Sequence, residues 1–251
     1  MKILAVGDVV GPDSIEYLQK HLRDFARSQG ADAIIVNGEN ASKGNGLSSP
    51  DAKALLDAGA DVVTTGNHVW KKGDLKSLLD DSEYVLRPAN FPDAAPGRGY
   101  TIIDVGIKRL LVINLMGVSY MEPLDNPFDT LDKILAEAEG KYDYSILDFH
   151  AEATGQKGAL ANCFDGRIDA IFGTHTHVQT ADARTLPGGT AFITDIGMTG
   201  PDDSVLGIMK ERVIYKLRTH LPSRFDPAEG HITAHGAVFD LDTHKCAAVT
   251  F

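Results

Sequence analysis

The sequence contains few of the residues that would place it in a specialised class of protein. Only two of its 251 residues are cysteine, which excludes a disulfide framework and provides no thiolate metal site. A reducing cytoplasm is therefore the expected location. Basic side chains are in the minority, since 24 Lys and Arg stand against 35 Asp and Glu, a net charge of −11. Because binding to long nucleic acids or anionic membranes needs a basic surplus, neither partner is expected.

Long apolar runs are also missing. No stretch approaches the roughly 20 apolar residues that cross a bilayer, and the opening run Lys2–Gly7 is too short for a signal peptide. Hydrophobic residues nevertheless make up 43% of the chain and charged residues 24%, the composition of an ordinary globular protein. The length fits one large domain, and no repeat divides the chain, so residues 1–251 are expected to form a single domain.

Apolar runs and amphipathic stretches alternate in the first half of the chain. We expect strands at Lys2–Gly7, Ala33–Asn37 and Asp61–Thr65, because these runs are short and rich in β-branched residues. We expect helices between them at Pro12–Gln29 and Pro50–Ala58, each with proline at its start. Strand, helix and strand at this spacing predict βαβ units with parallel pairing, and hence an α/β fold.

The second half predicts further strands. Gly99–Val105 and Arg109–Leu115 flank Gly106, which indicates an antiparallel pair. The segment Asp202–Leu217 fits either a helix or a long loop with a strand. The remaining expected elements are a helix at Phe128–Glu139 and strands at Asp143–Phe149, Arg167–Phe172, Thr190–Thr194, Ile232–Leu241 and Cys246–Phe251.

Polar side chains follow five of these strands. Ligands bind at the carboxyl edge of the strands in open α/β sheets, so a polar group after each of five strands predicts a shared site. His175 and His177 are the sharpest signal, because alternate residues of an extended segment point to one side. The candidate residues are Asp8, Glu39, Asn40, Asn67, His68, His150, His175 and His177.

Ligand chemistry predicts the contents of this site. The candidates supply oxygen and nitrogen donors without sulfur, which suits Mn, Fe or Zn. They are too numerous for one ion and about right for two. Two divalent ions outweigh the charges of Asp8 and Glu39 and would attract an anion such as a phosphate ester. A metal pair about 4 Å apart can hold a hydroxide for in-line attack on phosphorus. His68 directly follows Asn67 and is expected to point elsewhere, as a free imidazole able to protonate a leaving oxygen.

Several strings in this sequence resemble the calcineurin-like metallophosphoesterases, and within them the bacterial YmdB-like cyclic-nucleotide phosphodiesterases. The resemblance covers nearly the whole chain. It is carried by Asp8, Asn37-Gly38-Glu39-Asn40-Ala41, Gly66-Asn67-His68-Val69-Trp70, Arg87-Pro88-Ala89-Asn90, His150-Ala151-Glu152-Ala153-Thr154, Gly173-Thr174-His175-Thr176-His177 and Asp195-Ile196-Gly197-Met198-Thr199-Gly200. It implies a four-layer α/β/β/α sandwich of two mixed sheets.

The resemblance also implies a role for each site residue. Asp8 and His177 would bind the first metal, Glu39 would bridge both metals, and Asn67, His150 and His175 would bind the second. Asn40 would be a further ligand and His68 the general acid. The implied metals are two divalent or trivalent ions, foremost Fe or Mn, with Zn or Ni as alternatives.

The sequence departs from the broad family at two ligand positions. Most members have Asp-x-His after the first strand, whereas this chain has Val10 at the third position. Most also bridge the metals with Asp, where this chain has Glu39. Both departures match the YmdB-like subgroup. With an imidazole missing from the first metal, Asn40 is the residue expected to replace it.

The leading functional prediction is a dinuclear metal phosphodiesterase that hydrolyses small phosphodiesters, with 2′,3′- or 3′,5′-cyclic nucleotides suggested by the resemblance. A non-catalytic module that binds metal or nucleotide is the alternative, although it would have no need to keep His68. An amide hydrolase with two metals would use a similar ligand set. A dinucleotide-binding dehydrogenase fails, because no G-x-G-x-x-G follows the first strand. A homo-oligomer stays open.

Other residues carry weaker signals. The loop Lys43-Gly44-Asn45-Gly46 fits a flexible turn better than a phosphate cradle, because it lacks the form of a P-loop. Trp70, the only tryptophan, is expected to pack rather than to stack on a base. Lys157 fits either a substrate contact or a solvated helix start. His231 and His235 are expected to be structural.

Overall fold

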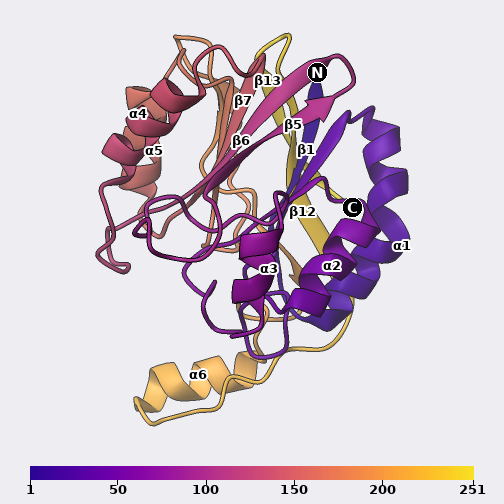
Figure 1. The fold of residues 1–251 in the computed structure, drawn as a ribbon. Coiled ribbons are helices and arrows are strands. Elements are labelled where there is room, and N and C mark those ends of the chain that lie inside the picture. Colours follow the sequence, from indigo (N-terminus) through magenta and orange to yellow (C-terminus); the bar gives the residue numbers. More distant parts are fainter.

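Two β-sheets lie face to face between two layers of helices (Figure 1). The computed structural model describes residues 1–251. Both sheets contain parallel and antiparallel pairs, so the predicted four-layer sandwich of mixed sheets is confirmed.

The first sheet combines the two ends of the chain. β1 (Lys2–Val6) pairs in parallel with β3 (Ala33–Asn37) and antiparallel with β12 (Ile232–Asp240). The full order is β2 (Asp8–Val9), β11 (Met198–Pro201), β12, β1, β3 and β4 (Val62–Thr64), with β13 (Lys245–Thr250) also paired to β12.

The second sheet is built from the middle of the chain. β5 (Tyr100–Val105) and β6 (Lys108–Met116) form the predicted antiparallel pair. β6, β7 (Tyr144–His150), β8 (Ala170–Thr174) and β10 (Ala191–Ile193) then run parallel, and β9 (Arg184–Thr185) closes the far edge.

Alternation along the strands explains the layers, because successive side chains point to opposite faces of a sheet. In β1, Ile3 and Ala5 face the second sheet, while Leu4 and Val6 face the helices. α1 (Pro12–Gln29) and α2 (Ser49–Ala58) cover the first sheet, and α4 (Pro127–Ala138) and α5 (Thr154–Cys163) cover the second (Figure 1).

The structure corrects some of the predicted boundaries. The strand expected at Arg167–Phe172 runs from Ala170 to Thr174, because Arg167 is held in a tight turn by its N–H bond to the Phe164 carbonyl. His150 is the last residue of β7 rather than the residue after it. The ambiguous segment contains α6 (Lys210–Thr219), and α3 (Leu75–Asp81) lies where no element was expected.

None of the helices has the length and apolar character needed to span a membrane. Cys163 and Cys246 are both free thiols.

Candidate metal centre

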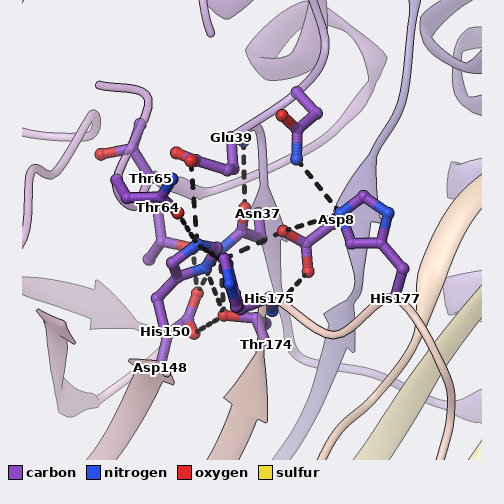
Figure 2. A network of polar contacts seen from close by, with 12 residues as sticks. Asp8, Asn37, Glu39, Thr64, Thr65, Asp148, His150, Thr174, His175 and His177 are labelled. Atoms are coloured by element: carbon purple, nitrogen blue, oxygen red, sulfur yellow. Dashed lines mark hydrogen bonds and ion pairs between the residues drawn. The ribbon is translucent and has the colours of Figure 1, made fainter. Parts of the chain in front are cut away.

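All eight predicted side chains come together at the carboxyl edges of the two sheets. Figure 2 shows five of them, Asp8, Glu39, His150, His175 and His177. The first sheet and its loops supply Asp8, Glu39, Asn40, Asn67 and His68. The second sheet supplies His150 at the end of β7, with His175 and His177 just after β8. The site therefore lies across the junction between the sheets, and neither sheet holds it alone.

One group of donors surrounds the ring of His150. Its Nε2 atom lies 3.0 Å from Oδ1 of Asn67, 3.1 Å from Nδ1 of His175 and 3.7 Å from Oε1 of Glu39. Ligands about 2.1 Å from one ion are about 3.0–3.5 Å from each other, depending on the coordination geometry. The distances from His150 to Asn67 and to His175 fall in this range, whereas the distance to Glu39 is slightly longer.

A second group lies beside Asp8. Nε2 of His177 is 3.8 Å from Oδ1 of Asp8 and 3.2 Å from Nδ2 of Asn40. Oδ1 of Asn40 faces Nδ1 of His68 at 2.9 Å. In this orientation Asn40 links two histidines and presents its amide nitrogen to the His177 side. The reverse amide orientation, which exchanges the two atoms, would turn its oxygen toward Asp8 and His177.

Two buried carboxylate oxygens have no hydrogen-bond partner, Oδ1 of Asp8 and Oε2 of Glu39. An unpaired buried charge is costly, and bound cations would compensate both atoms. The His, Asp and Glu side chains do not form a group of three with the arrangement of a metal site. The amide of Asn67 lies 3.0 Å from Nε2 of His150 and that of Asn40 lies 3.2 Å from Nε2 of His177, so each can supply a further oxygen donor. The fit to divalent metal ions therefore rests on the chemistry of the donors and on the two unpaired carboxylate oxygens.

The protonation of the site suits metal binding. Burial lowers the pKa of His150 well below its usual value, with the neighbouring His175 adding to the effect. Burial also lowers the pKa of His177 to about 4. Burial and the nearby Asp195 raise the pKa of Asp8. Neutral imidazoles are the form that coordinates metal, and a cation would return the Asp8 carboxyl to its charged form.

The segment around His175 and His177 is not extended. The prediction that both imidazoles point to one side, as alternate residues of an extended segment do, was therefore wrong. The φ angles are 99° at His175 and 63° at His177, both in the left-handed region. The two rings consequently turn to different donor groups, His175 toward His150 and His177 toward Asp8 (Figure 2). Strained backbone of this kind clusters at functional sites.

Gly66 allows Asn67 to approach the second sheet. A Cβ atom on residue 66 would lie 2.2 Å from Cδ2 of His150, which no side chain can tolerate. The glycine of Gly66-Asn67-His68 is therefore required because the His150 ring packs directly against this backbone.

A buried carboxylate beneath the histidines was missed in the sequence. Asp148 accepts hydrogen bonds from Asn37 at 2.8 Å and from Thr64 and Thr174, and Thr174 also contacts Nδ1 of His150 at 2.9 Å (Figure 2). Burial raises the pKa of Asp148 to about 6 despite these hydrogen bonds. The available signal was an acidic residue inside the apolar run of β7.

A buried ion pair was also missed, and it corrects both alternatives given for Lys157, a substrate contact and a solvated helix start. The Lys157 side chain is 1% exposed, and its Nζ lies 2.7 Å from Oδ2 of Asp195. The same oxygen accepts from the backbone N–H of Thr176 at 3.2 Å and from its hydroxyl at 2.7 Å. The pair therefore holds the residue between His175 and His177.

A further carboxylate orients His175. Oε2 of Glu152 lies 3.1 Å from Nε2 of His175. When Nε2 carries the proton, Nδ1 keeps its lone pair and can act as a metal ligand on the side of His150. Carboxylates commonly orient metal-binding histidines in this way.

The site opens into a pocket of about 410 Å³. Gly44 and Asn45 of the loop next to Lys43 line it, together with His68, Glu152 and Phe225. The other weak signals lie outside this lining. Trp70 packs edge-on against Phe91, as expected. His235 bonds the Met198 carbonyl and His231 bonds Asp202, in keeping with structural roles.

Known proteins with this sequence pattern identify the family. The family model described as YmdB-like protein matches residues 4–251. The chain belongs to the YmdB-like family.

Three relatives cover almost all of the chain. The 2′,3′-cyclic-nucleotide 2′-phosphodiesterase of Bacillus subtilis is 46% identical over 249 residues, which are 99% of this chain and 94% of that protein. A crystal structure of a protein from Thermus thermophilus is 40% identical with a TM-score of 0.92, covering 100% of this chain and 98% of that one. A phosphatase structure from Mycoplasma pneumoniae is 33% identical, also with a TM-score of 0.92, covering 100% and 93%. The YmdB-like fold is thus shared over its full length.

Proposed function

We propose that this protein is a metal-dependent phosphodiesterase that opens 2′,3′-cyclic nucleotides. The observation that carries the proposal is the pair of donor groups at the sheet edges, with two buried carboxylate oxygens that lack partners. The substrate class rests on the relative from Bacillus subtilis, which is 46% identical.

Two metal ions fit the division of the donors. Asn67, His150, His175 and Glu39 would hold one ion, while Asp8 and His177 would hold the other with Asn40 in its reversed orientation. Glu39 would reach both, because its Oε1 atom approaches His150 and its Oε2 atom is unpaired. Fe or Mn suits this oxygen and nitrogen set best, with Zn or Ni as alternatives. When bound, such ions lower the pKa of water and neutralise charge on phosphoryl oxygens.

His68 is the residue that would donate the proton that the leaving oxygen needs. Its Nδ1 atom lies 3.1 Å from Oε1 of Glu39, and its side chain is 25% exposed at the pocket. Hydrogen bonding at Nδ1 fixes the ring and leaves Nε2 for the substrate. Water adds across the bond between phosphorus and the 2′ oxygen, and the proton from His68 ends on that oxygen. The product keeps its phosphate at the 3′ position.

The test is hydrolysis of 2′,3′-cyclic AMP by metal-stripped protein, with and without added Mn²⁺. We expect turnover only with metal, and 3′-AMP as the product. We expect His68→Ala to bind the same amount of metal and to lose about 10²–10⁴-fold in kcat.

Three other outcomes would contradict parts of the proposal. Metal binding without turnover of any cyclic nucleotide would favour a non-catalytic binding module. Release of 2′-AMP would show that the 3′ oxygen is the leaving group, contrary to the proposal. Full activity in His68→Ala would place the general acid elsewhere.

A further inference from the structure

Exposed apolar side chains are concentrated in one segment of the chain. The protein has eleven large hydrophobic residues that are exposed, and seven of them lie within residues 206–225. The seven are Leu206, Met209, Ile214, Tyr215, Leu217, Leu221 and Phe225. A patch of this kind on a globular protein marks an interaction surface.

Helix α6 at the centre of this segment projects away from the two sheets (Figure 1). It buries none of its ten residues. Its ion pairs are local, with Lys210 bonded to Asp203 and Arg212 to Asp226. An isolated helix of this length is marginal in water, so its apolar stripe, Val213, Ile214 and Leu217, needs a covering surface.

The charge of α6 limits which kinds of surface can cover it. α6 carries four basic side chains and one acidic one, a net charge of +3, whereas the whole chain carries −11 and the remainder therefore −14. A basic apolar helix would also suit an anionic membrane, but the strongly acidic remainder would be repelled from one. Pairing of α6 with another α6 is disfavoured as well, since both carry the same charge.

The chain itself contains a complementary surface. Residues 119–129 include Glu122, Asp125 and Asp129 and no lysine or arginine, a net charge of −3. All three acids are exposed, and Tyr120 beside them is 93% exposed. This segment, which leads into α4, therefore complements α6 in charge, and Tyr120 provides one exposed apolar side chain for contact.

We infer that α6 of one copy packs against residues 119–129 of a second copy. In a two-fold symmetric dimer the contact forms twice, so both basic helices and both acidic segments are covered. The inference stands independently of the proposed catalytic activity. It also concerns the pocket, because Leu206 and Phe225 of the same segment line it beside His68.

The first experiment measures molar mass by sedimentation over a range of concentrations up to about 100 µM, within reach of weak specific contacts. We expect the wild type to reach twice the chain mass of 27.0 kDa and Leu217→Asp to dissociate at least tenfold more readily. Ile107→Asp is the matched control, because Ile107 is 98% exposed in the turn between β5 and β6. A wild type that stays monomeric, or a variant with unchanged association, would overturn the inference.

The second experiment tests the acidic surface by charge reversal. Arg218→Glu and Glu122→Lys should each weaken association, and the double variant should recover at least part of the loss. Absence of recovery would overturn the assignment of residues 119–129. Binding of wild type, but not of Leu217→Asp, to phosphatidylglycerol vesicles would assign α6 to a membrane instead.

Discussion

Lys157 and Asp195 influence the histidines without facing the pocket, because both are buried beneath the loop that carries His175 and His177. Replacing Lys157 with Met leaves a buried carboxylate without its cation. We expect Lys157→Met to lower the free energy of unfolding by about 3–5 kcal/mol and to weaken Mn²⁺ binding about 10–100-fold. Urea unfolding and titration calorimetry measure the two effects.

Two further variants test whether the ion pair between Lys157 and Asp195 only packs α5 or also positions the loop that carries His175 and His177. Thr176→Val removes only the hydroxyl bond to Asp195 and should cost about 1 kcal/mol while still weakening Mn²⁺ binding. Asn162→Ala, an exposed position on the same helix as Lys157, should change stability by less than about 0.5 kcal/mol. Metal affinity that is unchanged in both Lys157→Met and Thr176→Val would show that the ion pair serves only the packing of α5.

Asp148 gives the metal-free protein a distinctive pH dependence. Its pKa is about 6 when folded and about 3.9 when unfolded, so the folded state holds the extra proton between these values. The free energy of unfolding should therefore fall as pH rises from about 4 to 6, by on the order of 2–3 kcal/mol. His177 has a folded pKa of about 4 and an unfolded pKa of about 6.5. Its contribution to the free energy of unfolding therefore rises as pH increases between these values.

Comparison with Asp148→Asn separates these two contributions. The difference in unfolding free energy between wild type and variant should decline across pH 4–6 and stay level above that range. A difference that is constant with pH would show that Asp148 is ionised throughout.

The gathering of these polar side chains could be foreseen at this level because ligand-type residues follow successive strands, and parallel strands end at one sheet edge. Asp148 and Lys157 could not, since nothing in a single sequence shows which charged residues become buried together. The backbone at His175 was also beyond prediction, because a left-handed φ at a histidine is imposed by its surroundings and has no local signal.

Helices differed in how well the sequence predicted them. α1 was predicted with its observed bounds, because Pro12 starts it and Gly30 ends it in a left-handed conformation. α3 has only seven residues and no side-chain cap, so its pattern was too short to recognise. α6 was ambiguous in the sequence, and in the structure none of its ten residues is buried.

The contrast between α1 and α6 predicts different costs for the same substitution. Leu22 of α1 is fully buried, whereas Leu217 of α6 is 69% exposed. Leu22→Ala should lower the free energy of unfolding by about 2–5 kcal/mol, and Leu217→Ala by less than about 0.5 kcal/mol when measured on dilute protein. Equal losses in urea unfolding would mean that α6 is packed even in the monomer.

The two sheets share one hydrophobic cluster, which includes Ile3 and Ile35 of the first sheet and Val112 and Phe172 of the second. Separating the sheets would expose this cluster to water on both faces.

The composition of the strands predicted β-structure. The order in which β12 and β11 join the first sheet came from the structure, because the residue pattern does not encode which distant strands pair.

Residues 1–251 should consequently unfold as one unit, as a single domain does. We expect urea transitions followed by far-ultraviolet circular dichroism and by Trp70 fluorescence to coincide. Phe172→Ala should shift both midpoints together, at a cost of about 3–5 kcal/mol. Two separate transitions would divide the chain into units that the shared cluster does not unite.

The position of β12 has a consequence for synthesis of the protein. β1 is synthesised long before one of its two neighbours, because β12 comes from residues 232–240. Until residues 232–240 have been synthesised, β1 has a free edge that can pair with strands of other nascent chains. A product terminated before residue 232 would keep that edge for its whole lifetime, which makes truncated chains candidates for aggregation and for removal by chaperones and proteases.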